Sequence, residues 1–280
     1  MTSFYKVLIT VLVICLICFV MYKRSAYKLQ ALLQHETTLT SSNNQLFSNH
    51  QVQHLAIIMD GNRRWARSHK LAVWQGHENG IKPVKQAVKF CLEYNVPYLT
   101  LYAFSMENFS RPEEELTRLF SIISKGLQEE ELQQLLSKGV KIKIVGNSST
   151  FPKSTRQIIE NIQEQTKNGT QLTVNILFCY GGRQEITHVT KVIAEKVKAG
   201  TLSPDNINDK VVNEHLWTYP APDPDLVIRT GGKCRLSNFL PWQITYSELL
   251  FIDTYWPDIT KKDLEEAVEK FTKRTRNFGV

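Results

Sequence analysis

From residue 54 onward, short apolar runs alternate with longer segments in which apolar residues recur every three or four positions. The apolar runs cover residues 55–59, 99–104, 140–145, 172–178, 225–229 and 248–252. The periodic segments lie near residues 79–94, 113–138, 153–167, 183–198, 207–217 and 261–275. Short apolar runs separated by amphipathic helices are typical of parallel strands joined by crossover helices. The pattern predicts a single α/β domain with about six mainly parallel strands flanked by helices.

The first fifty residues follow a different pattern. Residues 7–22 are almost entirely apolar, and Lys23 and Arg24 follow directly. This favours a retained membrane anchor over the alternative, a cleaved signal peptide. We predict a hydrophobic helix with a basic flank over 1–33, a polar linker over 34–53 and the main domain over 54–280. The positive-inside rule then predicts a membrane-anchored protein, in contact with membrane lipid, whose main domain is cytosolic, at the endoplasmic reticulum in a eukaryote or the inner membrane in a bacterium.

Composition and charge narrow the function classes. The chain carries 34 Lys and Arg against 27 Asp and Glu, a formal net charge of +7, with 42% hydrophobic and 22% charged residues. This balance excludes a wholly disordered chain and a polytopic membrane protein. The mild positive excess suits an anionic ligand but is far below a nucleic-acid-binding signature, so no nucleic acid partner is expected.

The end of the first predicted strand carries an unusual group of residues. It continues as DGNRRW (60–65), with an acid, a glycine that permits close backbone approach, and two arginines at a helix start. Because ligands bind beyond the carboxyl ends of parallel strands, this segment is a candidate diphosphate cradle. The alternative is the ordinary turn chemistry of an Asp-Gly pair.

Two further predicted strand ends are rich in arginine and hydroxyl groups. One continues as SMENFSRP (105–112) and the other as RTGGKCRLS (229–237). For the first, the alternative is a capping segment of the next helix, with Ser110 as the cap. Three such ends at one edge of a sheet indicate two or more phosphate groups bound side by side.

Five blocks of the sequence together carry a close resemblance to a known family. They read HLAIIMDGNRRWA, QGHENG, LYAFSMENFSRP, YGGRQEI and DLVIRTGGKCRLSNFLPWQITYSELLFID, and the match spans residues 54–279. They resemble the cis-prenyltransferases, such as undecaprenyl diphosphate synthase and dehydrodolichyl diphosphate synthase. The resemblance implies a Mg²⁺-dependent enzyme that adds isopentenyl diphosphate to an allylic diphosphate such as farnesyl diphosphate. It also implies that the product is a long-chain polyprenyl diphosphate, a lipid carrier precursor for glycan synthesis.

The resemblance also implies roles for individual residues. Asp60 would be the central catalytic acid and a Mg²⁺ ligand, with Glu248 as the second ligand. Asn108 would act with Ser105 in condensation and proton removal. Because an amide is a poor base, we expect Asn108 to position or relay the proton rather than keep it. The implied substrate-binding residues are Gly61, Asn62, Arg63, Arg64, Trp65, His77, Ser105, Met106, Glu107, Phe109, Arg111, Arg229, Arg235, Leu236 and Ser237.

These residues divide between the two substrates. By the resemblance, residues 61–64 and His77 would cradle the allylic diphosphate, while the isopentenyl diphosphate would be held by Arg229, Arg235 and Ser237. Plainer alternatives are a helix-capping role for His77 and a packing role for Trp65 and Phe109. The implied hydrophobic tunnel for the growing chain has as candidates Leu116, Leu119, Phe120 and Ile123, for each of which plain core is the alternative.

The C-terminus bears on assembly, because Asn277 stands where the family's C-terminal Arg-x-Gly tail has its arginine. That tail reaches a partner subunit's active site in the family. We expect a homodimer, and a heteromer with an Arg-x-Gly-bearing subunit is the alternative. As functions, a short-chain cis-prenyl diphosphate synthase, a non-catalytic subunit and a phosphatase that uses Asp60 stay open.

Overall fold

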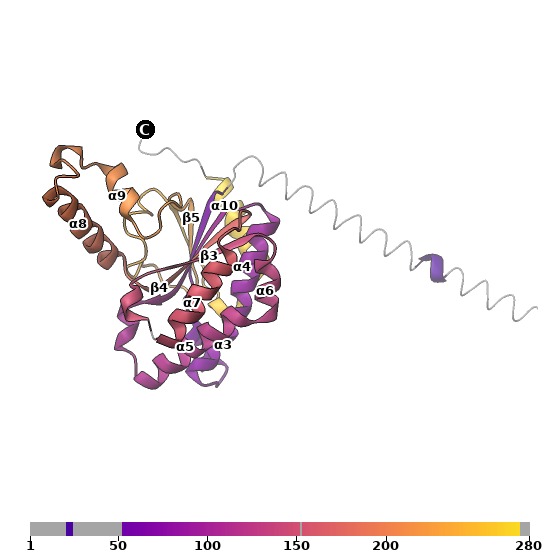
Figure 1. Ribbon diagram of the computed structural model, residues 1–280. Coiled ribbons are helices and arrows are strands. Elements are labelled where there is room, and N and C mark those ends of the chain that lie inside the picture. Colours follow the sequence, from indigo (N-terminus) through magenta and orange to yellow (C-terminus); the bar gives the residue numbers. More distant parts are fainter. Residues whose placement is uncertain (1–20, 25–51, 152, 275–280) are drawn as a thin grey trace, which may run out of the picture. The chain divides into compact units, whose positions relative to one another are not determined.

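A computed structural model describes residues 21–24, 52–151 and 153–274, in a chain that divides into two units, Met1–His50 and Gln51–Val280 (Figure 1). In the described part of the first unit, residues 21–24 are helical and exposed. Nowhere in the described ranges is a helix long and apolar enough to cross a membrane. The predicted membrane-anchored localisation must be corrected on this finding, since a crossing needs about 20 apolar helical residues. Apart from Met21 and Tyr22, the apolar run 7–22 lies outside the described residues.

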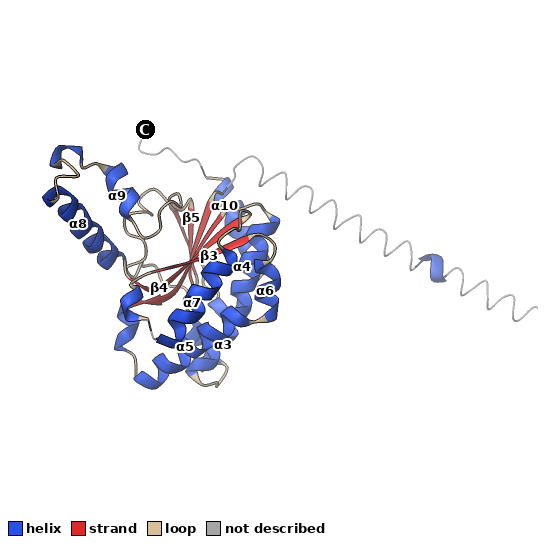
Figure 2. Cartoon of the chain, in the orientation of Figure 1, coloured by secondary structure: helices blue, strands red, loops and turns tan. Residues whose placement is uncertain are grey.

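The second unit is built on one sheet of six strands, drawn in red in Figure 2. The strands are β1 (His54–Ile58), β2 (Tyr98–Ser105), β3 (Val140–Val145), β4 (Leu172–Tyr180), β5 (Leu226–Arg229) and β6 (Glu248–Phe251). Their order is β3-β4-β2-β1-β5-β6, and every neighbouring pair is parallel. The predicted α/β fold is confirmed, because each of the six apolar runs forms a strand.

Strand β1 lies inside the sheet, between β2 and β5. Its neighbours and the flanking helices therefore exclude water from it. All five of its residues are buried, as are all four of β5. A strand covered on both faces reads as a continuous apolar run rather than an alternating one, as here. In register, Ile58 of β1 lies between Tyr102 of β2 and Arg229 of β5. The three strand ends singled out by the sequence therefore meet at one edge of the sheet.

The helices flank the sheet. They are α2 (Asn62–Ser68), α3 (Val73–Asn79), α4 (Ile81–Glu93), α5 (Glu113–Gln128), α6 (Glu130–Leu136), α7 (Lys153–Thr166), α8 (Gly182–Lys198), α9 (Asp209–His215) and α10 (Lys261–Thr272). In Figure 1, α3 to α7 gather along one side of the strands, while α8 and α9 form a pair on the other side. The single helix predicted over 113–138 is divided in two at Glu129, whose backbone is extended (φ −61°, ψ 135°).

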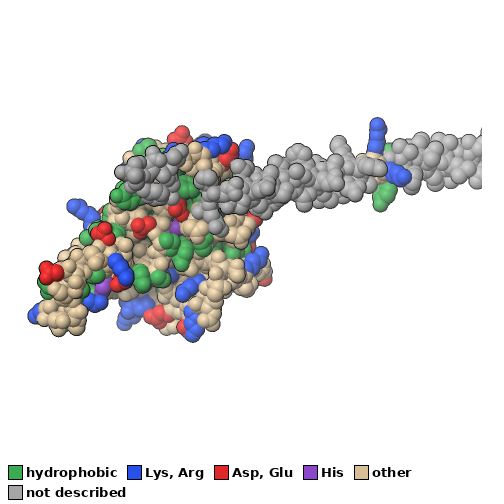
Figure 3. Space-filling view, turned by 90° about the horizontal axis from the view of Figure 1, so that it is seen from above, with side chains coloured by type: hydrophobic (Ala, Val, Ile, Leu, Met, Phe, Trp, Pro, Cys, Tyr) green, Lys and Arg blue, Asp and Glu red, His purple; other side chains and the backbone are tan. Residues whose placement is uncertain are grey.

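The face of the molecule in Figure 3 carries Lys and Arg side chains interspersed with Asp and Glu side chains. Several described helices have such charges paired one turn apart, as in Arg118 with Glu114 at 3.0 Å and Lys273 with Glu269 at 2.6 Å. Exposed pairs of this kind contribute little to stability, because water screens their charges and ordering two long side chains costs entropy. The buried strands, rather than these pairs, therefore account for most of the fold's stability.

His54 makes the stability of this fold depend on pH. Its side chain is 1% exposed, with Nε2 2.7 Å from Thr100 Oγ1 and Nδ1 2.6 Å from the Pro222 carbonyl oxygen. Burial lowers the pKa of His54 from 6.5 to about 4. Between pH 6.5 and 4 the unfolded chain therefore binds a proton at His54 that the folded chain does not bind. The contribution of the neutral His54 to stability is complete above pH 6.5 and is lost as the pH falls toward 4.

The full effect of His54 should approach about 3 kcal/mol. Urea unfolding at pH 7.0, 5.5 and 4.5 measures it, and His54→Gln should be less stable at pH 7 but have a visibly flatter pH dependence. His77 adds a slope of the same sign, so the variant keeps part of the dependence. An unchanged pH dependence in His54→Gln would contradict the assignment.

Candidate active site

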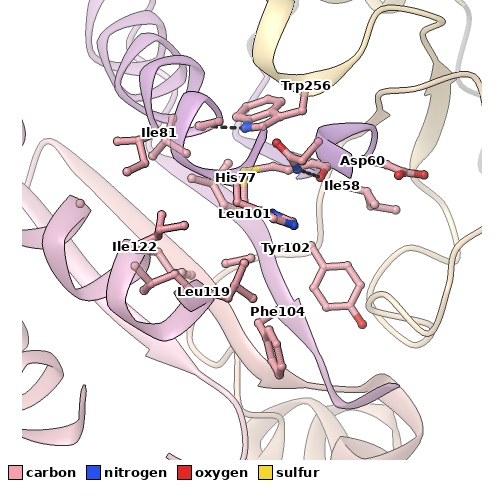
Figure 4. Close-up of a pocket in the computed structure, with 18 of the residues that line it drawn as sticks. Ile58, Asp60, His77, Ile81, Leu101, Tyr102, Phe104, Leu119, Ile122 and Trp256 are labelled. Atoms are coloured by element: carbon pink, nitrogen blue, oxygen red, sulfur yellow. Dashed lines mark hydrogen bonds between the residues drawn. The ribbon is translucent and has the colours of Figure 1, made fainter. Parts of the chain in front are cut away.

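A cavity of about 510 Å³ opens at the carboxyl ends of β1, β2 and β5 and continues between the sheet and helices α4 and α5. In Figure 4, Asp60 and Tyr102 lie at one end, while Ile81 and Ile122 lie at the other. The polar lining is Asp60, Asn62, Arg63, Arg64, Arg67, His77, Lys85, Tyr102, Ser105, Asn108, Arg111, Arg229, Arg235 and Ser237. The apolar lining includes Val84, Val88, Leu119, Ile122, Ile123, Leu127, Ile142 and Val174. The cavity is suited to a molecule with an anionic head and a hydrocarbon tail.

Asp60 and Arg229 form the centre of the polar end. Because Ile58 pairs in register with Arg229, the turn after β1 brings Asp60 beside the arginine. Arg229 Nη2 lies 2.8 Å from Asp60 Oδ2, and Arg64 Nη2 lies 3.2 Å from Asp60 Oδ1. Burial alone would raise the pKa of Asp60, but Arg229 and then Arg64 outweigh it and hold the pKa below its ordinary value. The Asp60 carboxylate is therefore ionised at neutral pH.

Gly61 allows the chain to turn closely after Asp60. Its φ is +111°, and a Cβ here would lie 2.7 Å from Cδ1 of Tyr255, so only glycine fits. The turn leads into α2, where Arg64 Nη1 donates to the carbonyl oxygen of Gly231 at 2.6 Å. The Arg64 guanidinium also lies 5.2 Å from the centre of the Tyr255 ring. These contacts orient Arg64 toward Asp60.

His77, Arg63 and Arg111 form a second polar group in the cavity. Arg63 and Arg111 share Glu115, at 3.5 Å and 3.4 Å. Burial, followed by the charges of Arg111 and Arg63, lowers the pKa of His77 to about 4, so its ring is neutral at pH 7. Within the described part of the chain, His77 Nε2, Arg63 Nε and Arg229 Nε are buried and have no hydrogen-bond partner. Because buried polar atoms are normally paired, these nitrogens indicate a site for an anionic ligand.

The turn after β2 brings Ser105 and Asn108 to the same cavity. It forms a short 3₁₀ helix, η1 (Met106–Ser110), and Asn108 Oδ1 accepts a hydrogen bond from the Ser105 backbone N–H at 3.1 Å. This contact orients the amide so that its Nδ2 group is the side available as a donor. An amide held in this way can position a reacting group but is a poor acceptor for a proton.

The loop after β5 supplies further donors. Arg229 Nη1 donates to Ser237 Oγ at 2.9 Å, and Arg235 Nε donates to the same oxygen at 3.2 Å. Arg229 Nη1 also donates to the carbonyl oxygen of Arg235. Arg229 is buried, whereas Arg235 and Ser237 are exposed. Cationic donors therefore lie on both sides of Asp60, from α2 on one side and from this loop on the other.

Several expected substrate-binding residues lie outside the cavity lining. Trp65 Nε1 donates to Asp258 Oδ1 at 2.7 Å, and the Trp65 ring lies 4.3 Å from that of His69. Leu236 packs against the buried cluster that contains Phe239. For these two residues the geometry favours a packing role over direct contact with a ligand.

Three of the expected substrate-binding residues lie on η1 and make contacts elsewhere in the protein. Met106 and Phe109 pack against the buried cluster around Phe104, where the Phe104 and Phe109 ring centres are 5.0 Å apart. Glu107 accepts a hydrogen bond from Asn238 Nδ2 at 2.8 Å. None of the three is in the cavity lining of the described structure, in contrast to Ser105 and Asn108.

Of the four predicted tunnel residues, two line the cavity and two do not. Leu119 and Ile123 line the cavity, but Leu116 and Phe120 pack into the aromatic cluster behind it. Ile122 lines the cavity and was not predicted, although it lies three positions from Leu119, a spacing that could have found it. Tyr102 was also missed; it lies inside a strand, and no local pattern distinguishes it from a core residue.

Glu248 does not lie with Asp60 in this chain. It opens β6 and pairs in register with Leu226, three residues before Arg229. At about 3.3 Å per residue, Glu248 is roughly 10 Å from the level of Arg229, toward the amino end of the sheet. Its carboxylate forms an ion pair with Arg274. The two expected metal ligands are not brought together, because parallel pairing puts the start of β6 and the end of β1 at opposite ends of the sheet.

The donor set at Asp60 nevertheless fits Mg²⁺. In the described ranges there is no group of three or more His, Cys, Asp or Glu that could hold a metal ion. Mg²⁺ at phosphate sites is usually held by one or two carboxylates, with substrate phosphates and waters completing its coordination. A single ionised carboxylate that faces an anion-binding cavity suits this mode.

Two curated proteins are similar to this chain over most of its length. The ditrans,polycis-undecaprenyl-diphosphate synthase of Micrococcus luteus is 42% identical over 227 residues, covering 81% of this chain and 91% of that protein. The tritrans,polycis-undecaprenyl-diphosphate synthase (geranylgeranyl-diphosphate specific) of Pyrococcus horikoshii is 41% identical over 228 residues, covering 81% and 86%. Both relatives match the chain over nearly all of their own length.

A solved structure is similar as well. Lavandulyl diphosphate synthase from Lavandula x intermedia, in complex with dimethylallyl diphosphate, matches with a TM-score of 0.80 and 31% identity over 82% of this chain and 98% of that one. The family model described as "Putative undecaprenyl diphosphate synthase" matches residues 58–279. The resemblance inferred from the sequence blocks is confirmed, and the chain belongs to the undecaprenyl diphosphate synthase family of prenyltransferases.

Proposed function

We propose that this protein is a cis-prenyltransferase that condenses isopentenyl diphosphate with an allylic diphosphate to make a polyprenyl diphosphate. One observation carries the proposal: cationic donors lie on both sides of the ionised Asp60, at the mouth of a cavity whose far end is apolar. Two diphosphates need two sets of donors, and a growing hydrocarbon chain needs apolar volume. The names of the similar proteins agree with this chemistry.

The two substrates would use different sets of donors. The allylic diphosphate would lie against Arg63, Arg64 and His77, where donors already in place stabilise the charge that develops as its C–O bond breaks. Isopentenyl diphosphate would lie against Arg229, Arg235 and Ser237. The electron pair of the breaking C–O bond leaves with the diphosphate, and the isopentenyl double bond supplies the pair for the new C–C bond. Transfer of one proton from the isopentenyl unit to an oxygen of the released diphosphate would restore a double bond, and Asn108 and Ser105 would position the unit for that transfer.

Mg²⁺ would be held by Asp60 together with substrate phosphate oxygens. When bound, the ion supplies positive charge that stabilises the leaving diphosphate. The role of the protein's own residues is to keep the Asp60 carboxylate ionised and oriented. Arg229 and Arg64 do this through their contacts with its two oxygens.

Product length should respond to the apolar end of the cavity. Ile122 is half-buried on α5 and lines the cavity at the end away from Asp60 (Figure 4). In Ile122→Trp the larger side chain fills part of the space that the growing chain needs, so shorter products should accumulate while the first condensation continues. Sizing of radiolabelled products by thin-layer chromatography measures this, with Ile186→Trp on the exposed face of α8 as the control. An unchanged product distribution would place the growing chain elsewhere.

The function is tested with purified protein, labelled isopentenyl diphosphate, Mg²⁺ and a series of allylic primers from dimethylallyl to geranylgeranyl diphosphate. Long butanol-extractable products that disappear with a chelator support the proposal. The similarity to lavandulyl diphosphate synthase favours a second candidate, a short-chain synthase, which would give only short products. Release of phosphate without a new C–C bond would instead indicate a phosphatase.

A homodimer remains our prediction for assembly. The C-terminal residues 277–279, which carry the departure from the Arg-x-Gly tail, lie outside the described residues. Light scattering on the purified protein measures its mass in solution. A dimer that is inactive alone but gains activity with an Arg-x-Gly-bearing subunit would favour the heteromer.

A further inference from the structure

Asn238 connects three segments that are far apart in the sequence. Its Nδ2 donates to Glu107 Oε1 at 2.8 Å and to Gln184 Oε1 at 3.0 Å. Its Oδ1 accepts from the Arg183 backbone N–H at 2.8 Å, and its carbonyl oxygen accepts from the Gly182 N–H at 2.9 Å. One side chain thus joins the loop after β5 to η1 and to the first turn of α8. None of these four contacts is used by the reaction chemistry described above.

The backbone around Asn238 is strained in a way that these contacts offset. Ser237 and Asn238 both have left-handed backbone angles, with φ of +52° and +63°. Left-handed angles are unfavourable for most residues, and asparagine tolerates them better than serine does. Asn238 is therefore well suited to the second position, and its hydrogen bonds stabilise the conformation that the first position requires.

The glycine pair at the start of α8 lets the loop approach closely. A Cβ on Gly181 would lie 2.7 Å from Asn238 Nδ2, and a Cβ on Gly182 would collide with Cδ of Pro241. Side chains at these two positions would push the loop away from α8. The Gly-Gly-Arg segment of the sequence thus serves as a docking platform for residues 238–241.

The docked loop carries residues of the proposed isopentenyl diphosphate site. Ser237, the neighbour of Asn238, receives hydrogen bonds from Arg229 and Arg235 through its hydroxyl group. The Tyr102 hydroxyl donates to the Ser237 carbonyl oxygen at 3.3 Å. On the other side of the connection, Glu107 immediately precedes Asn108. A shift at Asn238 would therefore change the spacing between the isopentenyl loop and the turn that carries Asn108.

We propose that Asn238 is a positioning residue that holds the isopentenyl diphosphate loop in register with the Ser105–Asn108 turn. This inference rests on the proposed function for the identity of the substrate, and on the four contacts for the geometry. Asn238 acts through Ser237 and Glu107 rather than through contact with the reacting atoms. Loss of the Asn238 contacts should weaken the binding of isopentenyl diphosphate. The binding of the allylic diphosphate, which is proposed to lie against α2 and α3, should change little.

The sharpest variant is Asn238→Asp, which keeps the size of the side chain and its tolerance of left-handed angles. The contact with the Arg183 N–H is retained, but the donor to Glu107 is replaced by an oxygen that faces a carboxylate. The KM for isopentenyl diphosphate should rise about tenfold or more, with a lower kcat and an unchanged KM for the allylic substrate.

Adding Glu107→Gln to Asn238→Asp restores the pair with donor and acceptor exchanged, because the new amide can donate to the new carboxylate. The double variant should recover most of the lost affinity for isopentenyl diphosphate. Asn206→Asp, an exposed site in the 3₁₀ turn Pro204–Asn206, makes the same chemical change elsewhere and should behave as wild type. Thermal unfolding of all four proteins separates positioning from loss of fold.

Hydrogen exchange provides a readout that does not depend on turnover. Amides of residues 234–240 should exchange faster in Asn238→Asp than in wild type and slow again in the double variant. Equal changes in both KM values, no rescue by Glu107→Gln, or unchanged exchange in the loop would each overturn the inference. A wild-type protein that makes no prenyl product would contradict the proposed function instead, and the exchange data would still decide whether Asn238 holds the loop.

Discussion

Replacing Asp60 with asparagine should lower kcat by about 10³-fold, the size expected when several kcal/mol of charge stabilisation is lost from a transition state. Asparagine keeps the shape and one oxygen for Arg229, but it removes the negative charge proposed to hold Mg²⁺. Arg229 and Arg64 lower the pKa of Asp60, so the wild-type carboxylate stays ionised across the neutral range. Initial rates at saturating substrates, measured over a Mg²⁺ titration, give the loss.

The control for this experiment is Asp205→Asn, the same chemical change at an exposed position in the Pro204–Asn206 turn. It should keep wild-type activity and the wild-type response to Mg²⁺. Unfolding curves for both variants test whether the fold is retained. If Asp60→Asn kept more than a tenth of the wild-type kcat, Asp60 would not be the centre of the reaction.

Replacing Arg229 with glutamine should damage both the site and the fold. The arginine side chain is 4% exposed and contacts Asp60, Ser237 and the Arg235 carbonyl group. Without it, kcat/KM for isopentenyl diphosphate should fall by about 10²- to 10³-fold. Removing one partner of a buried ion pair also costs about 3 kcal/mol, so the variant should unfold at a lower urea concentration.

Arg229→Lys separates these two effects. Lysine keeps the positive charge beside Asp60 but cannot make the forked contacts of a guanidinium to Asp60 and Ser237 together. It should therefore recover most of the stability and only part of the activity. Steady-state kinetics with each substrate varied in turn give the two KM values. An equal rise in both would show that Arg229 does not belong to the isopentenyl side.

The fold could be predicted from local patterns because each strand is a short apolar run, and β1 and β5 are buried throughout. The run that follows His54 in β1, residues 55–58, is apolar throughout, and so it could be recognised without knowing its neighbours. The break between α5 and α6 was missed because the apolar stripe continues across it while Glu129 adopts an extended backbone. Hydrophobic periodicity reports which side of a segment is buried, not whether its backbone is continuous.

The polar end of the site was predicted for a similar reason. Asp60, Ser105 and Arg229 each lie at or just after the carboxyl end of a strand, and parallel pairing brings those ends to one edge. Trp65 and Phe109 belong to the same sequence blocks but are not in the cavity lining of the described structure, and they contact Asp258 and Phe104 instead. Adjacent residues in a helical turn point in different directions, so membership of a block does not place a side chain in the site.

Periodicity, strand-end chemistry and the five sequence blocks were sufficient for the fold class, the family and the anionic nature of the ligand, because these depend on residue types and their order. Strand order and loop docking decided which of those residues meet. They separate Glu248 from Asp60 by placing it at the opposite end of the sheet, and they bring Asn238 to Glu107 across 131 positions of sequence. Such contacts depend on the packing of whole elements, and no local pattern in the chain records them.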